Sequence, residues 1–200
     1  MTWPSLFLLD PAQGPQRRRT PTRRPVRPGR LLPLLIAGTP CPACGGRLLV
    51  TQPQAQLLTL TAHGHTPRAV GRHLRSTKAQ VEDDLQALAA ELGAANPVHA
   101  IDIAYRAGLL RRSARFRRLD RPPTDSALTA LQGMAAGLTD SEIGRQTGRT
   151  ARAVDEARRR FMRMHSLHTR AQSVSLLHCV RLLDDTHTCP CQSDPEATTS

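Results

Sequence analysis

An internal repeat constrains this chain more than any other feature of its sequence. Residues 51–110 align without a gap with residues 124–183, at an offset of 73 positions. We call these segments the first repeat and the second repeat, and residues 73 positions apart equivalent. The matched positions include Leu58 and Leu131, Ala62 and Ala135, Thr77 and Thr150, and Val81 and Val154. A fixed period kept over about 60 residues indicates two copies of one structural unit.

Each repeat carries the sequence signals of a short helix, a tight turn and a longer helix. In the second repeat, Glu142 follows Thr139 at the spacing of a capping box, in which each residue bonds the backbone of the other. Gly148 can adopt the positive φ that a turn requires, and Thr150 can cap a further helix carrying Val154. This pattern is typical of a helix-turn-helix, whose second helix enters the DNA major groove.

Both repeats resemble the LuxR-type (GerE-like) four-helix DNA-binding domain of bacterial transcription regulators. The residues that carry the resemblance are Gly137-Leu138-Thr139, Glu142-Ile143-Gly144, Leu92-Gly93 and Gly108-Leu109-Leu110, with Val81 and Val154 matching half of the family's Thr-Val pair. The resemblance implies DNA recognition by the third helix of a unit, with Arg159 where the family commonly has a base- or phosphate-contacting lysine. Asp155 departs from the family, which has a lysine directly after the valine.

The expected fold is therefore all-α, with two tandem four-helix helix-turn-helix units. The expected segments are a disordered Pro- and Arg-rich arm (1–40), a CxxC knuckle (41–50), the first repeat (51–110), a basic connector (111–123), the second repeat (124–183) and an acidic tail (184–200). Within the arm, too few of residues 11–30 are apolar to offset the entropy of ordering that stretch. Thr66 before Pro67 and Asn96 before Pro97 predict two helix starts, and the fourth helix of the first repeat is expected to continue into the connector.

Charge is distributed unevenly along the chain. The sequence has 28 Lys and Arg against 16 Asp and Glu, a formal net charge of +12, which suits a polyanionic partner. The first repeat is neutral, with five basic and five acidic residues, whereas the second has nine arginines against five acids. The connector has six arginines and one acid, and the alternative to phosphate contact there is a solvated surface. The positive charge therefore lies mainly on the arm, the connector and the second repeat.

The candidate DNA-binding residues lie on the expected recognition helix of the second repeat and in the connector. They are Thr150, Arg152, Val154, Arg158, Arg159 and Arg160 on the helix, with Arg111, Arg112 and Arg115 in the connector. In the first repeat, Glu82, Asp83 and Asp84 fill the positions that would face DNA, and three consecutive acids repel phosphates. We expect the first repeat to keep the fold without groove binding, and to dock either the basic surfaces or a protein.

Two cysteine pairs flank the repeats. Cys41 and Cys44 form a CxxC on a Gly-rich turn, which resembles one half of a zinc ribbon, and Cys189 and Cys191 could complete a four-thiolate zinc site. The alternative is that these thiols are unliganded or transiently redox-active in a reducing cytosol. Cys179 is expected within the fourth helix, as a packing residue.

The sequence favours a bacterial, cytoplasmic, sequence-specific regulator of transcription that binds double-stranded DNA. No apolar run approaches the roughly 20 residues of a membrane span, and Ser, His and Asp are scattered without a catalytic motif, so neither a membrane partner nor an enzyme is expected. A homodimer or a protein of the transcription machinery is a further expected partner. The alternative function is a protein-interaction adaptor whose helix-turn-helix units no longer bind DNA.

Overall fold

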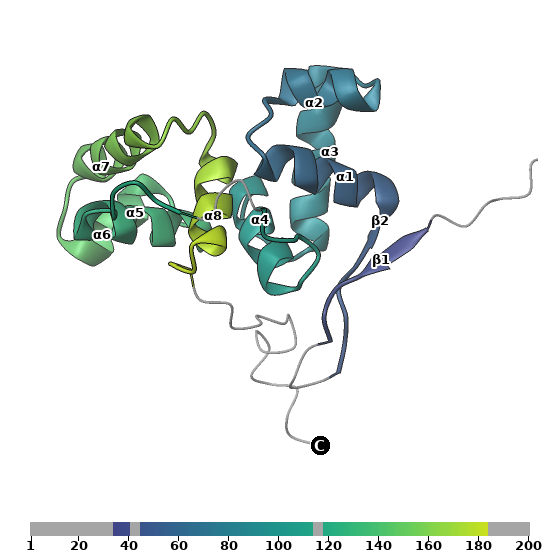
Figure 1. Ribbon diagram of the computed structural model, residues 1–200, viewed down its shortest axis with the longest axis horizontal. Coiled ribbons are helices and arrows are strands. Elements are labelled where there is room, and N and C mark those ends of the chain that lie inside the picture. The colour runs from purple at the N-terminus through teal and green to yellow at the C-terminus, as the bar shows by residue number, and fades with distance from the viewer. Residues whose placement is uncertain (1–33, 41–44, 114–117, 184–200) are drawn as a thin grey trace, which may run out of the picture. The chain divides into compact units, whose positions relative to one another are not determined.

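The computed structural model describes residues 34–40, 45–113 and 118–183, which form eight helices and one two-stranded sheet. The expected predominantly helical fold is confirmed (Figure 1). The helices of the first repeat are α1 (Gln52–Ala62), α2 (Pro67–Leu74), α3 (Lys78–Glu91) and α4 (Pro97–Arg106). Those of the second repeat are α5 (Asp125–Ala135), α6 (Asp140–Thr147), α7 (Ala151–Met164) and α8 (Arg170–Cys179).

The start of every helix follows from a side-chain cap. An oxygen of the preceding residue accepts a hydrogen bond from a backbone N–H of the first turn, which otherwise has no partner within the helix. The caps are Thr51, Thr66, Thr77, Asn96, Thr124, Thr139, Thr150 and Thr169. The predicted starts after Thr66, Asn96, Thr139 and Thr150 are confirmed.

A short antiparallel hairpin precedes α1. Strands β1 (Leu35–Ala37) and β2 (Leu49–Thr51) pair with Ile36 opposite Val50, and Val50 is buried against the helices. The expectation of a disordered arm up to residue 40 is therefore wrong at its end, because residues 35–37 form strand β1. Apart from residues 34–40, the arm lies outside the described residues.

The fourth helix of the first repeat ends earlier than expected. It stops at Arg106, Ala107 is its C-cap, and Gly108 adopts a left-handed conformation with φ of 68°. The Thr39 N–H donates to the Ala107 carbonyl at 2.7 Å, so a residue just after β1 satisfies a carbonyl at this helix end. The described residues of the connector, 111–113 and 118–123, contain no helix.

The two repeats share one hydrophobic core, centred on α4 and α8. These helices pack side by side, and nearly every residue from Ala100 to Tyr105 and from Ala171 to His178 is buried. The remaining contacts are reciprocal, because α1 packs against α8 as α5 packs against α4 (Figure 1). A separate cluster of Ala130, Ile143 and Val154 holds α5, α6 and α7 together. Reciprocal contacts of this kind are what an approximate two-fold relation between the repeats produces.

No helix among the described residues has the length and apolar character that crossing a membrane requires.

Candidate nucleic-acid interface

Helix α7 is positioned by a tight turn after α6. The capping box is present at the start of α6, where the Thr139 N–H donates to Glu142 Oε2 at 2.7 Å. This bond and that from the Thr139 hydroxyl lower the pKa of Glu142 and favour its charged form. Gly148 ends α6 with φ of 67°, as the turn was expected to require. A Cβ on Gly144 would lie 2.6 Å from the Arg149 carbonyl oxygen, so glycine lets the turn pass close to the helix.

One face of α7 is buried and fixes the orientation of the helix. Val154, Arg158 and Phe161 form this face, at spacings of four and three residues. Val154 is 3% exposed and packs in the small cluster with Ala130 and Ile143. The prediction that Val154 contacts DNA is therefore wrong for the protein as folded, and its role is to hold α7 against α5 and α6.

Arg158 is the second correction, because its side chain is only 3% exposed. Its Nη2 donates to Asp140 Oδ2 at 3.0 Å, from the first turn of α6, and also contacts Asp155 Oδ1. An unpaired guanidinium would be costly to bury, so these acids are what allow an arginine at this position. Arg158 thus joins α7 to α6 and does not present its charge to DNA.

The exposed face of α7 carries the other predicted arginines. The side chains of Arg159 and Arg160 are 68% and 69% exposed, and Arg152 is exposed at the start of the helix. Thr150 is also exposed, and its hydroxyl accepts from the Ala153 N–H at 3.2 Å. These four predicted residues lie on the solvent side of α6 and α7. Helix α7 has five arginines against two acids, a net charge of +3.

Asp155 does not present a free carboxylate to the solvent side. Its side chain is 27% exposed and its Oδ2 accepts from Arg159 Nε at 2.8 Å, while Oδ1 contacts Arg158. Partial burial disfavours the charged form of Asp155, but the neighbouring arginines outweigh it and lower its pKa. Asp155 stands where the family that the repeats resemble has a lysine, and its two ion pairs reduce the repulsion that its charge would exert on a phosphate.

Two further arginines belong to the same surface and were missed from the sequence. Arg149 in the turn and Arg163 near the end of α7 are exposed. Within the described residues neither has a carboxylate partner in an ion pair. Their spacing in the sequence could have identified them. They lie three, four or eleven residues from Arg152, Arg159 or Arg160, and positions at these spacings share one face of a helix. We call Arg149, Arg152, Arg159, Arg160 and Arg163 the arginine face.

The equivalent surface of the first repeat has the opposite charge. Helix α3 has one lysine against four acids, a net charge of −3, and the residues equivalent to Arg152, Arg159, Arg160 and Arg163 are Ala79, Gln86, Ala87 and Ala90. Glu82, Asp83 and Asp84 are all exposed. Glu82 pairs with Lys78 at 3.3 Å, and Asp84 accepts from Gln80 at 2.8 Å, so both contacts lie within α3. No ion pair among the described residues joins these acids to α7.

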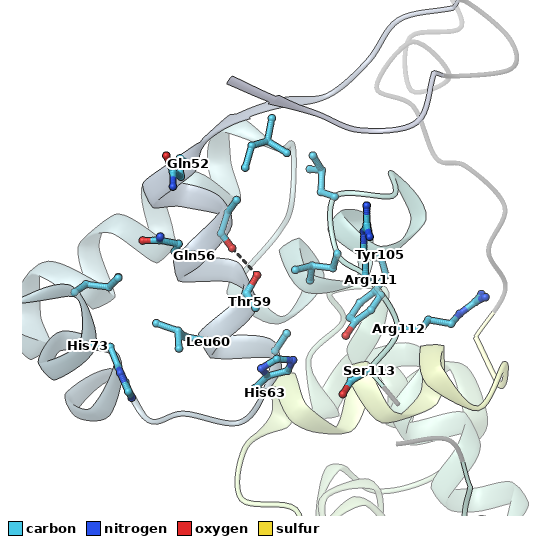
Figure 2. A pocket seen from close by; sticks show the side chains of 16 residues that line it. Gln52, Gln56, Thr59, Leu60, His63, His73, Tyr105, Arg111, Arg112 and Ser113 are labelled. Carbon is cyan, nitrogen blue, oxygen red and sulfur yellow. Dashed lines mark hydrogen bonds between the residues drawn. The ribbon is translucent and has the colours of Figure 1, made fainter. Parts of the chain in front are cut away.

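The predicted connector residues Arg111 and Arg112 border a cleft whose lining includes no residue of α7. Both are exposed, and this open cleft of about 840 Å³ lies between α1 and the residues after α4 (Figure 2). Leu60, Tyr105 and Leu110 contribute to its lining, and the guanidinium of Arg112 extends away from α1. Both arginines could therefore contact phosphates from the surface. Arg115 lies outside the described residues.

The zinc prediction falls on parts of the chain that the structure does not describe. Cys41, Cys44, Cys189 and Cys191 all lie outside the described residues, so the site stays a prediction. In the sequence, Cys41 and Cys44 lie between the residues of β1 and those of β2. Cys179 ends α8 and is half-buried, as expected for a packing residue, and burial raises the pKa of its thiol.

Comparisons of the chain with protein-family models, with curated proteins and with solved structures each gave no match. The likeness to the LuxR type therefore depends on the short motifs of the two repeats.

Proposed function

We propose that this chain is a sequence-specific, double-stranded DNA-binding regulator of transcription, made of two tandem helix-turn-helix units. In this proposal α6 and α7 form the DNA-binding pair, and α7 enters the major groove with its arginine face toward the bases and phosphates. Arg111 and Arg112 add backbone contacts, and zinc bound by Cys41, Cys44, Cys189 and Cys191 stabilises the fold. The protein acts in a bacterial cytoplasm.

The proposal depends most on how the arginines of α7 are divided between the buried face and the solvent-exposed face of the helix. Arg158 is buried and neutralised by Asp140 and Asp155, whereas Arg152, Arg159 and Arg160 remain on the solvent side. A helix held by a tight turn, with cations along the face opposite its packing face, has the form that major-groove recognition requires. Neutralising phosphates releases counterions, which supplies affinity for any duplex.

The acidic surface of α3 supports the second candidate, a protein-interaction adaptor. Such an adaptor would bind a basic partner through Glu82, Asp83 and Asp84 and would not need the arginine face. The two candidates differ in the salt dependence of DNA binding, because phosphate contacts give a steep slope.

The proposal can be tested by fluorescence anisotropy with a labelled 30-bp duplex of random sequence, titrated at several NaCl concentrations. We expect the wild-type affinity to fall linearly in a log–log plot against salt. Arg152→Ala with Arg159→Ala should reduce the slope by about 2, since each phosphate contact contributes about 0.9, and should weaken binding about tenfold or more at low salt.

The matched control removes the same charge from the first repeat. Arg68 and Arg72 are exposed on α2, so Arg68→Ala with Arg72→Ala leaves the net charge equal to that of the test variant. We expect the control to stay close to the wild type. Equal losses in both variants would indicate a general charge effect, and no binding by the wild type at low salt would favour the adaptor.

A further inference from the structure

The interface between the repeats brings equivalent residues together. The ring of Tyr105 on α4 stacks on the ring of His178 on α8, with centroids 4.7 Å apart and planes at 17°. These residues are equivalent, being 73 positions apart. In a two-fold interface, only residues at the axis meet their own counterparts. The stacked pair therefore marks the axis that relates the two repeats.

The polar contacts around this axis are different on its two sides. Asp102 Oδ1 lies 2.9 Å from His178 Nε2, and Asp102 Oδ2 accepts from Arg106 Nε at 2.6 Å. Asp102 and His178 are 2% and 0% exposed. The residue equivalent to Asp102 is Ser175, which carries no charge and whose hydroxyl donates to the Ala171 carbonyl within α8 at 3.1 Å. The contact of Asp102 with His178 therefore has no counterpart on the other side of the axis, whereas a symmetric dimer would have two identical contacts.

This asymmetry selects against pairing between like repeats. Two first-repeat faces would bury two copies of Asp102 opposite tyrosines: each carboxylate would keep Arg106 of its own helix but lose the histidine that meets its other oxygen across the interface. Two second-repeat faces would bury His178 opposite Ser175, with no carboxylate. Burying an unpaired polar or charged group is costly, so the interface favours a first repeat with a second repeat. The connector joins these partners in one chain, which raises their effective concentration for each other.

We propose that the chain binds DNA as a monomer and recognises a single, non-palindromic half-site, with the first repeat taking the place of a second subunit. This inference rests on the proposed function and specifies its substrate. One chain already contains both sides of the two-fold unit, and among the helices of the described residues only α7 carries the arginine face. The equivalent surface on α3 has alanines and glutamine in place of four arginines, next to three exposed acids. A second half-site is therefore not bound.

The test of the DNA target uses a pool of 40-bp duplexes with a randomised 20-bp centre, selected over several rounds with the full chain and sequenced. We expect an enriched motif without an inverted repeat. Light scattering of the selected complex should give one chain of 21.9 kDa per duplex. An inverted-repeat motif with two chains per duplex would overturn this inference and leave the proposed function in place. Absence of any DNA binding at low salt would overturn both.

A second test addresses the interface without DNA. Ser175→Asp with His178→Tyr gives the second repeat the residues of the first at both positions. We expect the melting temperature to fall by about 5 °C or more, since about 1 kcal/mol corresponds to 2–4 °C in a chain of this size. Adding Asp102→Ser with Tyr105→His restores an unlike pair and should recover part of that loss, since Cys179 stands where Arg106 pairs with the carboxylate in the first repeat. Lack of recovery, or a wild-type chain that is dimeric by light scattering, would overturn the inference.

Discussion

Helices α3 and α7 occupy equivalent positions in the two repeats and differ in almost every exposed residue. Each has fourteen residues and a threonine cap, and their buried positions coincide at Val81 and Val154. Their net charges are −3 and +3. The shared packing positions maintain one fold, whereas the solvent positions are free to determine the partner. The comparison therefore separates what the repeats need to fold from what each could bind.

The interiors of the repeats differ as well. Leu85 is buried in α3 where Arg158 is buried in α7, and Leu88 is replaced by Phe161. The groove between α1 and α3 has a volume of about 760 Å³, and the equivalent groove between α5 and α7 about 360 Å³. The larger Phe161 side chain fills part of the space in the second repeat. The groove on the side of the arginine face is thus the smaller of the two.

The largest expected effect comes from the buried arginine. Arg158→Ala should lower the free energy of unfolding by about 3 kcal/mol, because it leaves Asp140 and Asp155 without their shared partner. Arg158→Leu, which introduces the residue of the first repeat, should cost less because the space stays filled. Urea denaturation measures both. The control is Arg163→Ala, exposed on the same helix, which should change stability by no more than about 0.5 kcal/mol. Equal effects of the two alanine variants would contradict the structural role of Arg158.

The second prediction concerns the close contact between α5 and α6. A Cβ on Gly133 would lie 2.6 Å from Ile143 Cγ1, whereas the equivalent residue of the first repeat is Leu60. Gly133→Leu should therefore destabilise the protein by about 1–2 kcal/mol, even after its gain in helix propensity. Thr129→Leu, exposed on the same helix, is the control for thermal denaturation. A stability equal to or above that of the control would show that α6 can move away without cost.

The third prediction is a pH dependence specific to the second repeat. Because the pKa of Asp155 is lowered in the folded protein, its stabilising effect is present above the ordinary aspartate pKa of about 3.9 and is lost as the pH falls through the folded-state value. The stability difference between wild type and Asp155→Asn should therefore be large at pH 7 and disappear in more acidic solution. The equivalent Glu82→Gln should have little effect, since Glu82 and Lys78 are exposed. A pH-independent difference for Asp155→Asn would exclude the ion pairs as its cause.

The smallest expected effect is on DNA affinity. Neutralising α3 by Glu82→Gln, Asp83→Asn and Asp84→Asn removes a repulsion, and should tighten DNA binding by less than about fivefold at low salt, because exposed charges are strongly screened. Anisotropy titrations at low and high salt would measure it. An unchanged affinity at every salt concentration would show that α3 stays distant from the duplex.

The sequence predicted the local features of the fold well, because their causes are local. Thr66 before Pro67 and Thr139 before Glu142 specify helix starts through bonds within one turn. The early end of α4 also had a local signal, because Gly108 adopts the left-handed conformation directly after the C-cap Ala107. The contact that Thr39 makes at this end comes from far away in the sequence and could not be predicted in this way. The stacking of Tyr105 on His178 also depends on the packing of separate repeats.

The candidate site was predicted only in part for a related reason. The sequence identified α7, but burial of Arg158 depends on Asp140, eighteen residues away. The sequence nevertheless contained a signal for the burial of Arg158. Arg158 lies at helical spacing between Val154 and Phe161, which are both buried, and its equivalent in the first repeat is the apolar Leu85. Val154 was assigned to DNA by resemblance, while its spacing and its equivalent Val81 indicated packing.

The central claim is that α7 enters DNA and α3 does not, and cross-linking from two equivalent positions tests it most directly. Asp83 and Glu156 are equivalent, exposed and acidic, so a photoreactive amino acid at either position removes no cation from the arginine face. With a duplex obtained by selection, irradiation should cross-link DNA from position 156 and give only background from position 83. Equal cross-linking from both positions, or cross-linking from position 83 alone, would contradict the assignment of DNA binding to the second repeat.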